Sequence, residues 1–247
     1  MMGKLSLRSF VCGIGAFLLL WALAVHLLAM PVVPPPSEVF ARLAEKFTGV
    51  IAVHAGYSLM RIALGLSLAV AVGYPIGILM GYFPRVNRIL APMLYLAYPV
   101  PKIALLPVVM LIFGVGESGK ILLIFLIIVF QVVVAVRDAT AGIPAATYEP
   151  LRVLGASFWQ MVRHIVLPAS LPKFITAVRI AMATAISVLF FTETFGTKYG
   201  IGYYIMDAWL RVNYLDMYAG IAVLSAIGLL LFALLDAAEH VLCRWKN

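Results

Sequence analysis

The sequence predicts an all-α membrane protein of about six transmembrane helices, with a long loop between the fourth and the fifth. Of its 247 residues 64% are hydrophobic and only 11% are charged, whereas soluble domains are about half apolar and about one quarter charged. Six apolar stretches approach the roughly 20 residues that a helix needs to cross a bilayer. Lysine and arginine are also distributed unequally between alternate loops, as in multi-pass membrane proteins.

The six spans follow from the apolar runs and the charges that flank them. Residues 10–30 contain no charged residue, and no small-x-small cleavage signal precedes Pro31. We therefore expect a retained first span and not a signal peptide. The other five are expected between Arg61 and Arg85, over residues 89–114, between Lys120 and Arg137, over residues 174–195, and between Asp216 and Asp236.

A short amphipathic helix is expected between the first two spans. Three prolines precede Ser37, a residue type that caps helix N-termini. Residues 38–47 carry charges on one side and apolar residues on the other, namely Val39, Phe40, Leu43 and Phe47. This pattern is typical of a helix lying at a surface.

The orientation follows from the basic residues, because cytoplasmic loops retain an excess of them. With the N-terminus inside, ten basic residues are cytoplasmic and five are external. Both termini are therefore expected in the cytoplasm. The inner residues are Lys4, Arg8, Arg85, Arg88, Arg137, Arg152, Arg163, Lys173, Arg244 and Lys246; the outer ones are Arg42, Lys46, Lys120, Lys198 and Arg211.

This topology leaves one long cytoplasmic loop, residues 138–173, which the sequence predicts to be a helical hairpin. We expect Thr147 or a neighbour to cap the first helix, with Pro150 in its first turn. Gly155 can adopt the left-handed conformation that ends a helix.

The second helix of the hairpin is expected to begin at Ser157, which has capping-box spacing to Gln160. Phe158, Trp159 and Val162 supply its apolar bulk, Arg163 and His164 occupy its last turn, and Pro168 and Pro172 are expected to stop it before the fifth span. From these residues alone, docking in a groove of another protein and resting on lipid headgroups are equally reasonable roles.

The loop resembles the EAA loop of binding-protein-dependent ABC importer permeases. Glu149 is followed after five residues by Gly155, and after nine more by Ile165-x-Leu167-Pro168. Pro150 and Leu151 stand where that family has two alanines. Further segments resemble its nitrate/sulfonate/taurine branch: residues 36–40, 98–107, 113–117 and 200–203.

The resemblance implies that residues 1–247 form a single permease domain in a bacterial inner membrane. It implies a second permease copy, making a homodimer, a cytoplasmic ABC ATPase dimer that binds ATP and Mg, and an extracytoplasmic substrate-binding protein. The chain itself would hold no cofactor and would not be an enzyme. The implied solute is a small anion such as nitrate, an alkanesulfonate or taurine, although some members of the branch move heterocyclic compounds.

The resemblance also implies which residues couple the permease to the ATPase. The segment from Ser157 to His164 would be the coupling helix. The implied coupling residues are Glu149, Gly155, Ala156, Ser157, Phe158, Trp159, Arg163, Ile165, Leu167 and Pro168.

Charged residues inside spans are costly and often functional. Lys102 follows two prolines that break the third span, so it could hold an anion, or its side chain could snorkel or form an ion pair. Arg61 and Arg179 lie near span ends, where snorkelling is expected. Glu193 is expected to line the path or pair with a cation such as Arg61.

The candidate translocation path also includes hydroxyl residues, which alternatively permit close helix packing. The full set of path candidates is Tyr98, Lys102, Thr184, Ser187 and Glu193.

Other functions are less well supported by the sequence. The four histidines lack metal-ligand spacing, and Cys12 and Cys243 define no disulfide framework. An intramembrane enzyme would need a cluster of acid–base residues, which Glu193 alone does not provide. A secondary transporter or channel works without an ATPase-docking loop. The positive charge is explained by topology, so no nucleic-acid partner is expected, and no phosphate-binding Gly-x-x-x-x-Gly-Lys-Ser/Thr motif is present.

Overall fold

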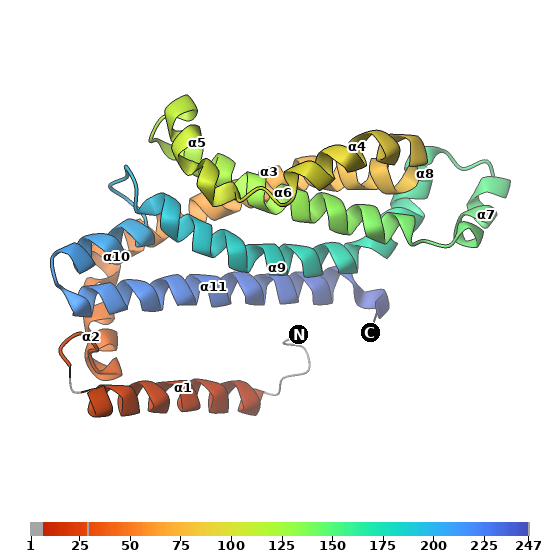
Figure 1. Ribbon diagram of the computed structural model, residues 1–247. Helices are drawn as coiled ribbons and strands as arrows, with labels where there is room; N and C mark the ends of the chain where they lie inside the picture. Colours follow the sequence, from red (N-terminus) through yellow and green to blue (C-terminus); the bar gives the residue numbers. More distant parts are fainter. Residues whose placement is uncertain (1–6, 29, 247) are drawn as a thin grey trace. The chain divides into compact units, whose positions relative to one another are not determined.

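A computed structural model describes residues 7–28 and 30–246, which form helices joined by short turns (Figure 1). The all-α prediction is confirmed. Lys4, which was counted among the cytoplasmic cations, lies outside the described residues. The helices are α1 (Leu7–Leu28), α2 (Pro36–Lys46), η2 (Phe47–Ile51), α3 (Ala52–Tyr82), α4 (Pro84–Ala97), η3 (Lys102–Leu105), α5 (Leu106–Phe113), α6 (Glu117–Ala141), α7 (Ala145–Val153), α8 (Phe158–Met161), η4 (Val162–Val166), α9 (Leu167–Glu193), α10 (Ile201–Leu210), α11 (Tyr214–Leu242) and η5 (Arg244–Lys246).

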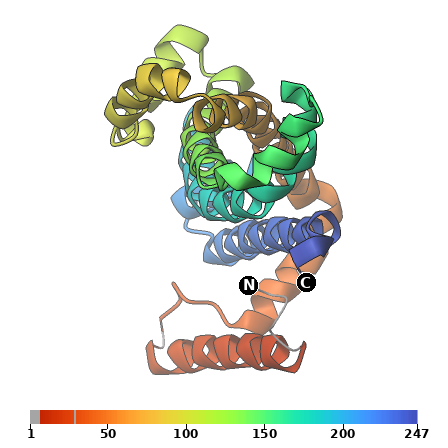
Figure 2. The same cartoon turned by 90° about the vertical axis from the view of Figure 1, so that its right-hand side faces the viewer.

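Within the described residues, four continuous helices are long and apolar enough to cross a membrane: Pro36–Tyr82, Glu117–Ala141, Phe158–Glu193 and Tyr214–Leu242. A fifth candidate is the pair Pro84–Ala97 and Lys102–Phe113, which is bent by 80° at the prolines that were expected to break it. Figures 1 and 2 show α5 turned away from α4 at this break. The apolar part of α1, Cys12–Leu28, is shorter. Six spans therefore stay a prediction.

The second span is longer than expected. Residues 38–47 were predicted as a separate surface helix, but α2, η2 and α3 form one helix of 47 residues. Ser37 is not its cap, because Pro35 occupies the N-cap position and Pro36 the first turn. The pyrrolidine ring presets the helical φ angle and lacks the N–H that would be unsatisfied there.

The fifth span is also continuous with the loop helix before it. Pro168 and Pro172 were expected to stop that helix, but it runs without interruption from Phe158 to Glu193. Pro168 directly follows the π-helical segment η4, whose altered hydrogen-bond spacing accommodates a residue without an N–H inside the continuous helix. Pro172 lies inside α9, as prolines do in transmembrane helices.

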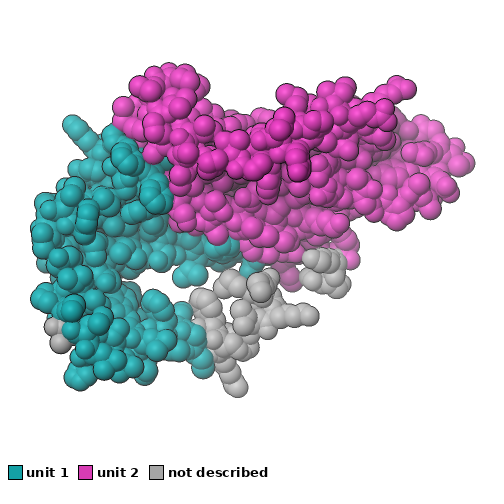
Figure 3. All heavy atoms as spheres, in the orientation of Figure 1, with its two compact units in different colours: residues 1–61, 189–236 teal, residues 62–188, 237–247 magenta. Residues whose placement is uncertain are grey.

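The chain divides into two compact units, shown in different colours in Figure 3. Unit 1 comprises residues 1–61 and 189–236, and unit 2 comprises residues 62–188 and 237–247. The single domain expected over the whole chain stays a prediction. In unit 1 a buried apolar core joins α2, η2, α10 and α11, and Trp21 of α1 packs on it by stacking on Tyr218 at 5.7 Å between ring centroids. The buried core residues are Val39, Ile51, Ile201, Tyr204, Ile205, Ala219, Val223 and Ile227.

Glycines bring α3 and α6 into close contact in unit 2. Gly73, Gly77 and Gly81 recur every four residues on α3. A Cβ atom at Gly77 would lie 2.7 Å from the Val136 Cβ, and one at Gly81 would lie 2.5 Å from the Thr140 Cβ. Such a small-xxx-small stripe lets two helix backbones approach, which membrane helices use for packing where no hydrophobic force is available.

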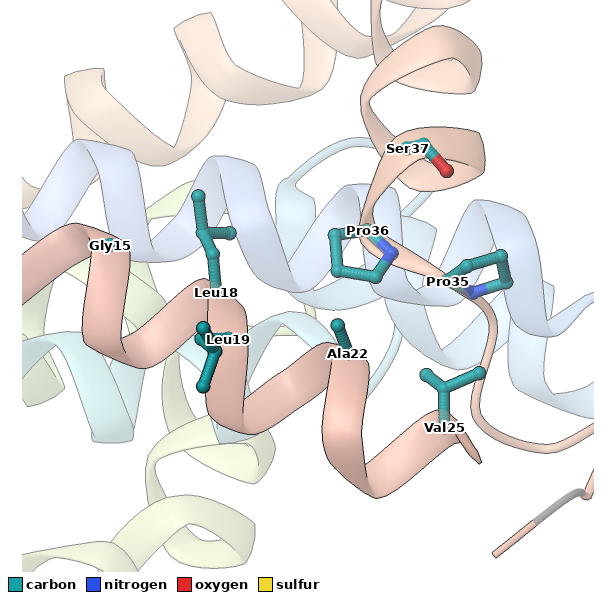
Figure 4. A pocket seen from close by; sticks show the side chains of 8 residues that line it. All are labelled: Gly15, Leu18, Leu19, Ala22, Val25, Pro35, Pro36 and Ser37. Carbon is teal, nitrogen blue, oxygen red and sulfur yellow. The ribbon is translucent and has the colours of Figure 1, made fainter. Parts of the chain in front are cut away.

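An apolar pocket of about 510 Å³ lies in unit 1 between α1 and the beginning of α2 (Figure 4). Of its lining residues only Ser37 has a polar side chain. This pocket does not suit a charged solute, so the candidate site lies elsewhere. The lining residues are Gly15, Leu18, Leu19, Ala22, Val25, Pro35, Pro36 and Ser37.

Candidate functional site

The first helix of the predicted cytoplasmic loop is α7, between the end of α6 and the beginning of α9 (Figure 1). It begins at Ala145 with Pro144 in the N-cap position. Thr147 is therefore not the cap. It lies inside the first turn of α7, and its N–H donates to the Pro144 carbonyl at 3.0 Å. Pro150 was expected in the first turn of α7, but it lies further along the helix, in its interior.

The turn after α7 is built as predicted. Gly155 has φ +70°, in the left-handed region, and its N–H bonds to the Arg152 carbonyl at 2.9 Å. Ser157 then forms the expected capping box. Its N–H donates to Gln160 Oε1 at 2.6 Å, and its Oγ accepts from the Gln160 N–H at 3.4 Å. The turn therefore has little conformational freedom.

Aromatic contacts attach the loop to the end of α3. The Tyr148 ring lies 5.7 Å from the Tyr82 ring, and the Phe158 ring lies 5.1 Å from Tyr82 and 5.3 Å from Phe83. Edge-to-face and tilted ring pairs of this kind stabilise by about 0.5–1.5 kcal/mol beyond their buried area. Burial in this cluster raises the pKa of the Tyr148 hydroxyl.

Three large apolar side chains at the turn remain exposed, and we call them the loop tip: Val153, Leu154 and Trp159. Their exposed fractions are 87%, 80% and 75%. Val153 and Leu154 come from the end of α7, and Trp159 from the beginning of α8. The loop tip is therefore a compact apolar knob on a rigid hairpin.

The predicted coupling residues next to the loop tip differ in their exposure to solvent. All seven of those before Ile165 are exposed or half-buried, whereas Ile165 is 8% exposed and packs inward. The outward group consists of Glu149, Gly155, Ala156, Ser157, Phe158, Trp159 and Arg163, and Leu167 and Pro168 lie beyond Ile165 with partial exposure.

A second candidate site lies at the break between α4 and α5. The Lys102 Nζ donates to the Ala97 carbonyl at 2.9 Å and also to the Tyr98 carbonyl. It lies 4.9 Å from the centroid of the Phe130 ring and 5.4 Å from that of Tyr98. The ammonium is thus held by carbonyl dipoles at the end of α4 and by aromatic faces.

Lys102 lines a cleft of about 290 Å³ in unit 2. Three of the predicted path residues, Tyr98, Lys102 and Thr184, meet there. Ser187 does not line this cleft, and its hydroxyl bonds to the Ala183 carbonyl at 3.2 Å. Sequence reasoning missed Phe130 and Gln131, although Gln131 is the one polar residue in the uncharged run of the fourth span. The lining residues are Tyr98, Val100, Pro101, Lys102, Ile103, Ile127, Phe130, Gln131, Thr184 and Val188.

Arg61 and Glu193 form a buried ion pair in unit 1. Both side chains are 0% exposed, and Arg61 Nη1 lies 2.6 Å from Glu193 Oε1. Snorkelling of Arg61 is therefore wrong, and pairing with Glu193 is confirmed. A charge at this depth is tolerated because its partner neutralises it.

The same carboxylate helps to cap α10, which begins after Gly200. The N–H groups of Gly200, Ile201 and Gly202 donate in turn to His54 Nδ1 at 3.1 Å, Ser58 Oγ at 2.9 Å and Glu193 Oε2 at 2.8 Å. Three consecutive amides of a helix N-terminus, normally unsatisfied, thus bond to side chains of α3 and α9. We call His54, Ser58, Arg61 and Glu193 the α10 cap cluster.

Two other features of the described residues differ from or extend the predictions. Arg179 was expected to snorkel, but its Nη2 pairs with Glu239 Oε2 at 2.8 Å. Tyr204 is buried beside Asp216, and burial together with that negative charge raises the pKa of Tyr204 to about 12. Within the described residues, no three His, Cys, Asp or Glu side chains gather as a metal site.

The chain matches known transport proteins over most of its length. A model of the family "binding-protein-dependent transport system inner membrane component" matches residues 73–245. The chain is 33% identical over 234 residues to the taurine transport system permease protein of Escherichia coli, covering 92% of this chain and 85% of the relative. It is 33% identical over 217 residues to the putative aliphatic sulfonates transport permease protein of Bacillus subtilis, covering 87% and 79%.

Two further similarities are more distant. The chain is 26% identical over 231 residues to the formylaminopyrimidine transport permease protein of Halalkalibacterium halodurans, covering 93% of this chain and 92% of the relative. A chain of the inward-facing MetNI methionine ABC transporter has the same fold, with a TM-score of 0.66 at 20% identity over 80% of this chain and 96% of that one. This chain therefore belongs to the family of inner-membrane components of binding-protein-dependent transport systems, and it is a multi-pass permease subunit of an ABC importer.

Proposed function

We propose that the loop tip is the site at which a cytoplasmic ABC ATPase binds this permease and drives import. The observation that carries the proposal is the exposure of Val153, Leu154 and Trp159 on a rigid turn. Contiguous exposed apolar side chains mark interaction sites, and a central aromatic anchor is typical of residues that dominate binding energy.

The shape of the loop tip favours a protein groove over a lipid surface. An interfacial helix presents a long apolar stripe parallel to the membrane. Here the exposed residues flank a turn between α7, which has nine residues, and the first residues of the continuous helix Phe158–Glu193. Such a knob fits a concave partner.

The helix that begins at the loop tip supports a mechanical role. Phe158 to Glu193 is one continuous helix, so the segment that an ATPase would bind is the beginning of a membrane span. The ATPase must bind the loop with different affinity in its two nucleotide states, because only differential binding shifts a conformational equilibrium. Glu149, Gly155, Ala156, Ser157, Phe158 and Trp159 would form the contact. Arg163, Ile165, Leu167 and Pro168 would join it to the span.

The assembly that this proposal requires follows the family. Two copies of this chain form the translocation path, with both termini in the cytoplasm. The ATPase dimer binds ATP and Mg and supplies the hydrolysis, so the chain itself needs no cofactor. An extracytoplasmic binding protein delivers the solute.

The proposed solute is a small anion, such as an alkanesulfonate, taurine or nitrate. The names of two relatives, which describe taurine and aliphatic sulfonate transport, support this class. Lys102 supports it as well, because a cationic side chain at a broken helix next to a cleft attracts anions.

The test measures binding of the cognate ABC ATPase to purified permease carrying Leu154→Ser and Trp159→Ala. Loss of an anchor of this kind costs about 2 kcal/mol or more, which is about 30-fold in affinity. ATP-driven uptake in proteoliposomes should fall in parallel. Trp209→Ala is the matched control, since Trp209 is an exposed tryptophan of α10, on the predicted external side. Unchanged affinity and uptake in the loop-tip variant would contradict the proposal.

A further inference from the structure

The Lys102 cleft carries a positive charge that no carboxylate in its lining neutralises. Among its ten lining residues Lys102 is the only charged one. Its ammonium has three N–H groups, of which two donate to the carbonyls of Ala97 and Tyr98. Carbonyl dipoles and aromatic faces hold the ammonium in place but do not cancel its charge. One N–H remains for a ligand.

Two neutral donors lie around the same cleft. Gln131 of α6 contributes an amide NH₂ group and Thr184 of α9 contributes a hydroxyl. Together with Lys102, three donors from three segments border one hollow, which matches the several acceptor oxygens of a tetrahedral or planar acid group.

The rest of the lining is apolar. Ile103, Ile127, Phe130 and Val188 contribute aliphatic and aromatic surface. A cleft of about 290 Å³ with a polar corner and apolar walls is suited to a small molecule with one charged end and one hydrocarbon end.

We infer that this cleft is a subsite of the translocation path for short-chain organic monoanions whose acid head group carries several oxygens, such as a sulfonate, and that it disfavours zwitterions. The sulfonate oxygens accept hydrogen bonds from Lys102, Gln131 and Thr184, and the alkyl chain contacts the apolar wall. An ammonium group on the far end of the ligand meets no carboxylate among the lining residues and is repelled by Lys102. The inference rests on the proposed function and narrows its solute class, placing ethanesulfonate above taurine.

The test places a single thiol in the cleft and asks which anions protect it. The background is the full chain with Cys12→Ser and Cys243→Ala, assembled with its cognate ATPase in nanodiscs. In this background Thr184→Cys is labelled with N-ethylmaleimide in the presence of ethanesulfonate or taurine. These two probes have the same two-carbon chain and differ by the amino group.

We expect ethanesulfonate to slow labelling of the Thr184→Cys variant by at least about fivefold at saturation, and at a concentration about tenfold lower than taurine requires. Adding Lys102→Met should weaken protection by about 10- to 100-fold, the effect of losing one charge-assisted hydrogen bond. Ser187→Cys is the matched control, because it lies on the same helix, does not line the cleft, and should be labelled at the same rate with and without anion.

Equal protection by taurine and ethanesulfonate, or protection that persists in the Lys102→Met background, would overturn the inference. Protection of the Ser187→Cys variant would do the same, because it would show a general effect of the anion on the helix. The labelling readout needs no transport, so its failure is separable from failure of the proposed function, which would appear as unchanged ATPase affinity and uptake in the loop-tip variant.

Discussion

Replacing Glu193 with alanine removes one side of a buried ion pair and one of the three capping acceptors of α10. Glu193 accepts hydrogen bonds from Arg61 at 2.6 Å, from Ser58 at 2.8 Å and from the Gly202 N–H at 2.8 Å. Both Glu193 and Arg61 are 0% exposed. The substitution therefore removes the carboxylate that pairs with a buried guanidinium.

The expected effect on stability is large. Breaking a buried pair by removing one partner costs about 3–5 kcal/mol, because the remaining charge stays desolvated. For a chain of this size each kcal/mol lowers Tm by about 2–4 °C, which gives a decrease of about 6–20 °C. Arg61→Met should have a similar effect, since it leaves the Glu193 carboxylate buried.

The double variant Arg61→Met/Glu193→Leu separates charge burial from lost contacts. It removes both charges, so the groups that lose a partner are neutral. They are the Gly202 N–H, the Ser58 hydroxyl, the Tyr199 carbonyl and the Thr197 hydroxyl. We expect it to be about 1–3 kcal/mol more stable than the sum of the two single variants predicts.

The assay is thermal unfolding of the detergent-purified chain, followed by the amount that remains monodisperse after heating. Asp138→Asn is the control, because its ion pair with Arg137 is exposed and such pairs contribute about 0–1 kcal/mol. A Glu193→Ala variant as stable as the control, or a double variant whose loss equals the sum of the single losses, would refute the reasoning.

Three further predictions concern α3, the loop turn and α10. Gly81→Leu should lower stability by about 1–3 kcal/mol because a Cβ atom there would meet Thr140, whereas Gly56→Ala on the same helix, with open space around it, should be neutral or stabilising in the same thermal assay. Gly155→Val should weaken binding of the ATPase in a pull-down because φ +70° strains a β-branched residue, whereas Gly155→Asn should retain binding; equal binding by the two variants would contradict this. Burial and Asp216 raise the pKa of Tyr204 from 10.0 to about 12, so the folded state disfavours ionisation and the free energy of unfolding should decline between about pH 10 and 12. Tyr204→Phe should remove that decline in denaturant titrations at the two pH values, and an unchanged pH dependence would count against it.

The apolar runs predicted where helices lie better than where they end. The second span was expected to begin at Arg61, because a charge usually marks a membrane boundary. The helix extends to Pro36 instead, and Arg61 lies in its interior because Glu193, 132 residues away in the sequence, neutralises it. The charges alone suggested Glu193 as a partner, but local patterns did not show that the pair is buried inside a longer helix.

At the fifth span, the prolines led to a wrong prediction of where the helix ends. Pro168 and Pro172 predicted a helix end, but the π-helical segment Val162–Val166 precedes them and the helix continues. In contrast, Gly155 and the Ser157–Gln160 capping box were predicted correctly, because a left-handed turn and an N-cap depend on neighbouring residues alone.

The candidate sites show the same limit. Lys102 and Thr184 were identified as polar residues in spans, but their meeting with Phe130 and Gln131 depends on the packing of three helices. The glycine stripe of α3 had a readable signal, the recurrence of glycine at every fourth position. In the α10 cap cluster the Arg61–Glu193 pair was suggested by charge, but the capping of α10 had no such signal. His54, Ser58 and Glu193 are ordinary residues until the fold brings them to one helix end.

The most direct test of the central claim, that the loop tip is the cytoplasmic attachment point of the ATPase, is the sidedness of a thiol placed there. Trp159→Cys and Trp209→Cys are compared in the chain with Cys12→Ser and Cys243→Ala, using a membrane-impermeant maleimide on intact cells and on inside-out vesicles. The account predicts that the Trp159→Cys variant reacts only in vesicles and is protected when the ATPase is bound, while the Trp209→Cys variant reacts only in intact cells. Labelling of the Trp159→Cys variant in intact cells, or in vesicles at the same rate with and without bound ATPase, would contradict it.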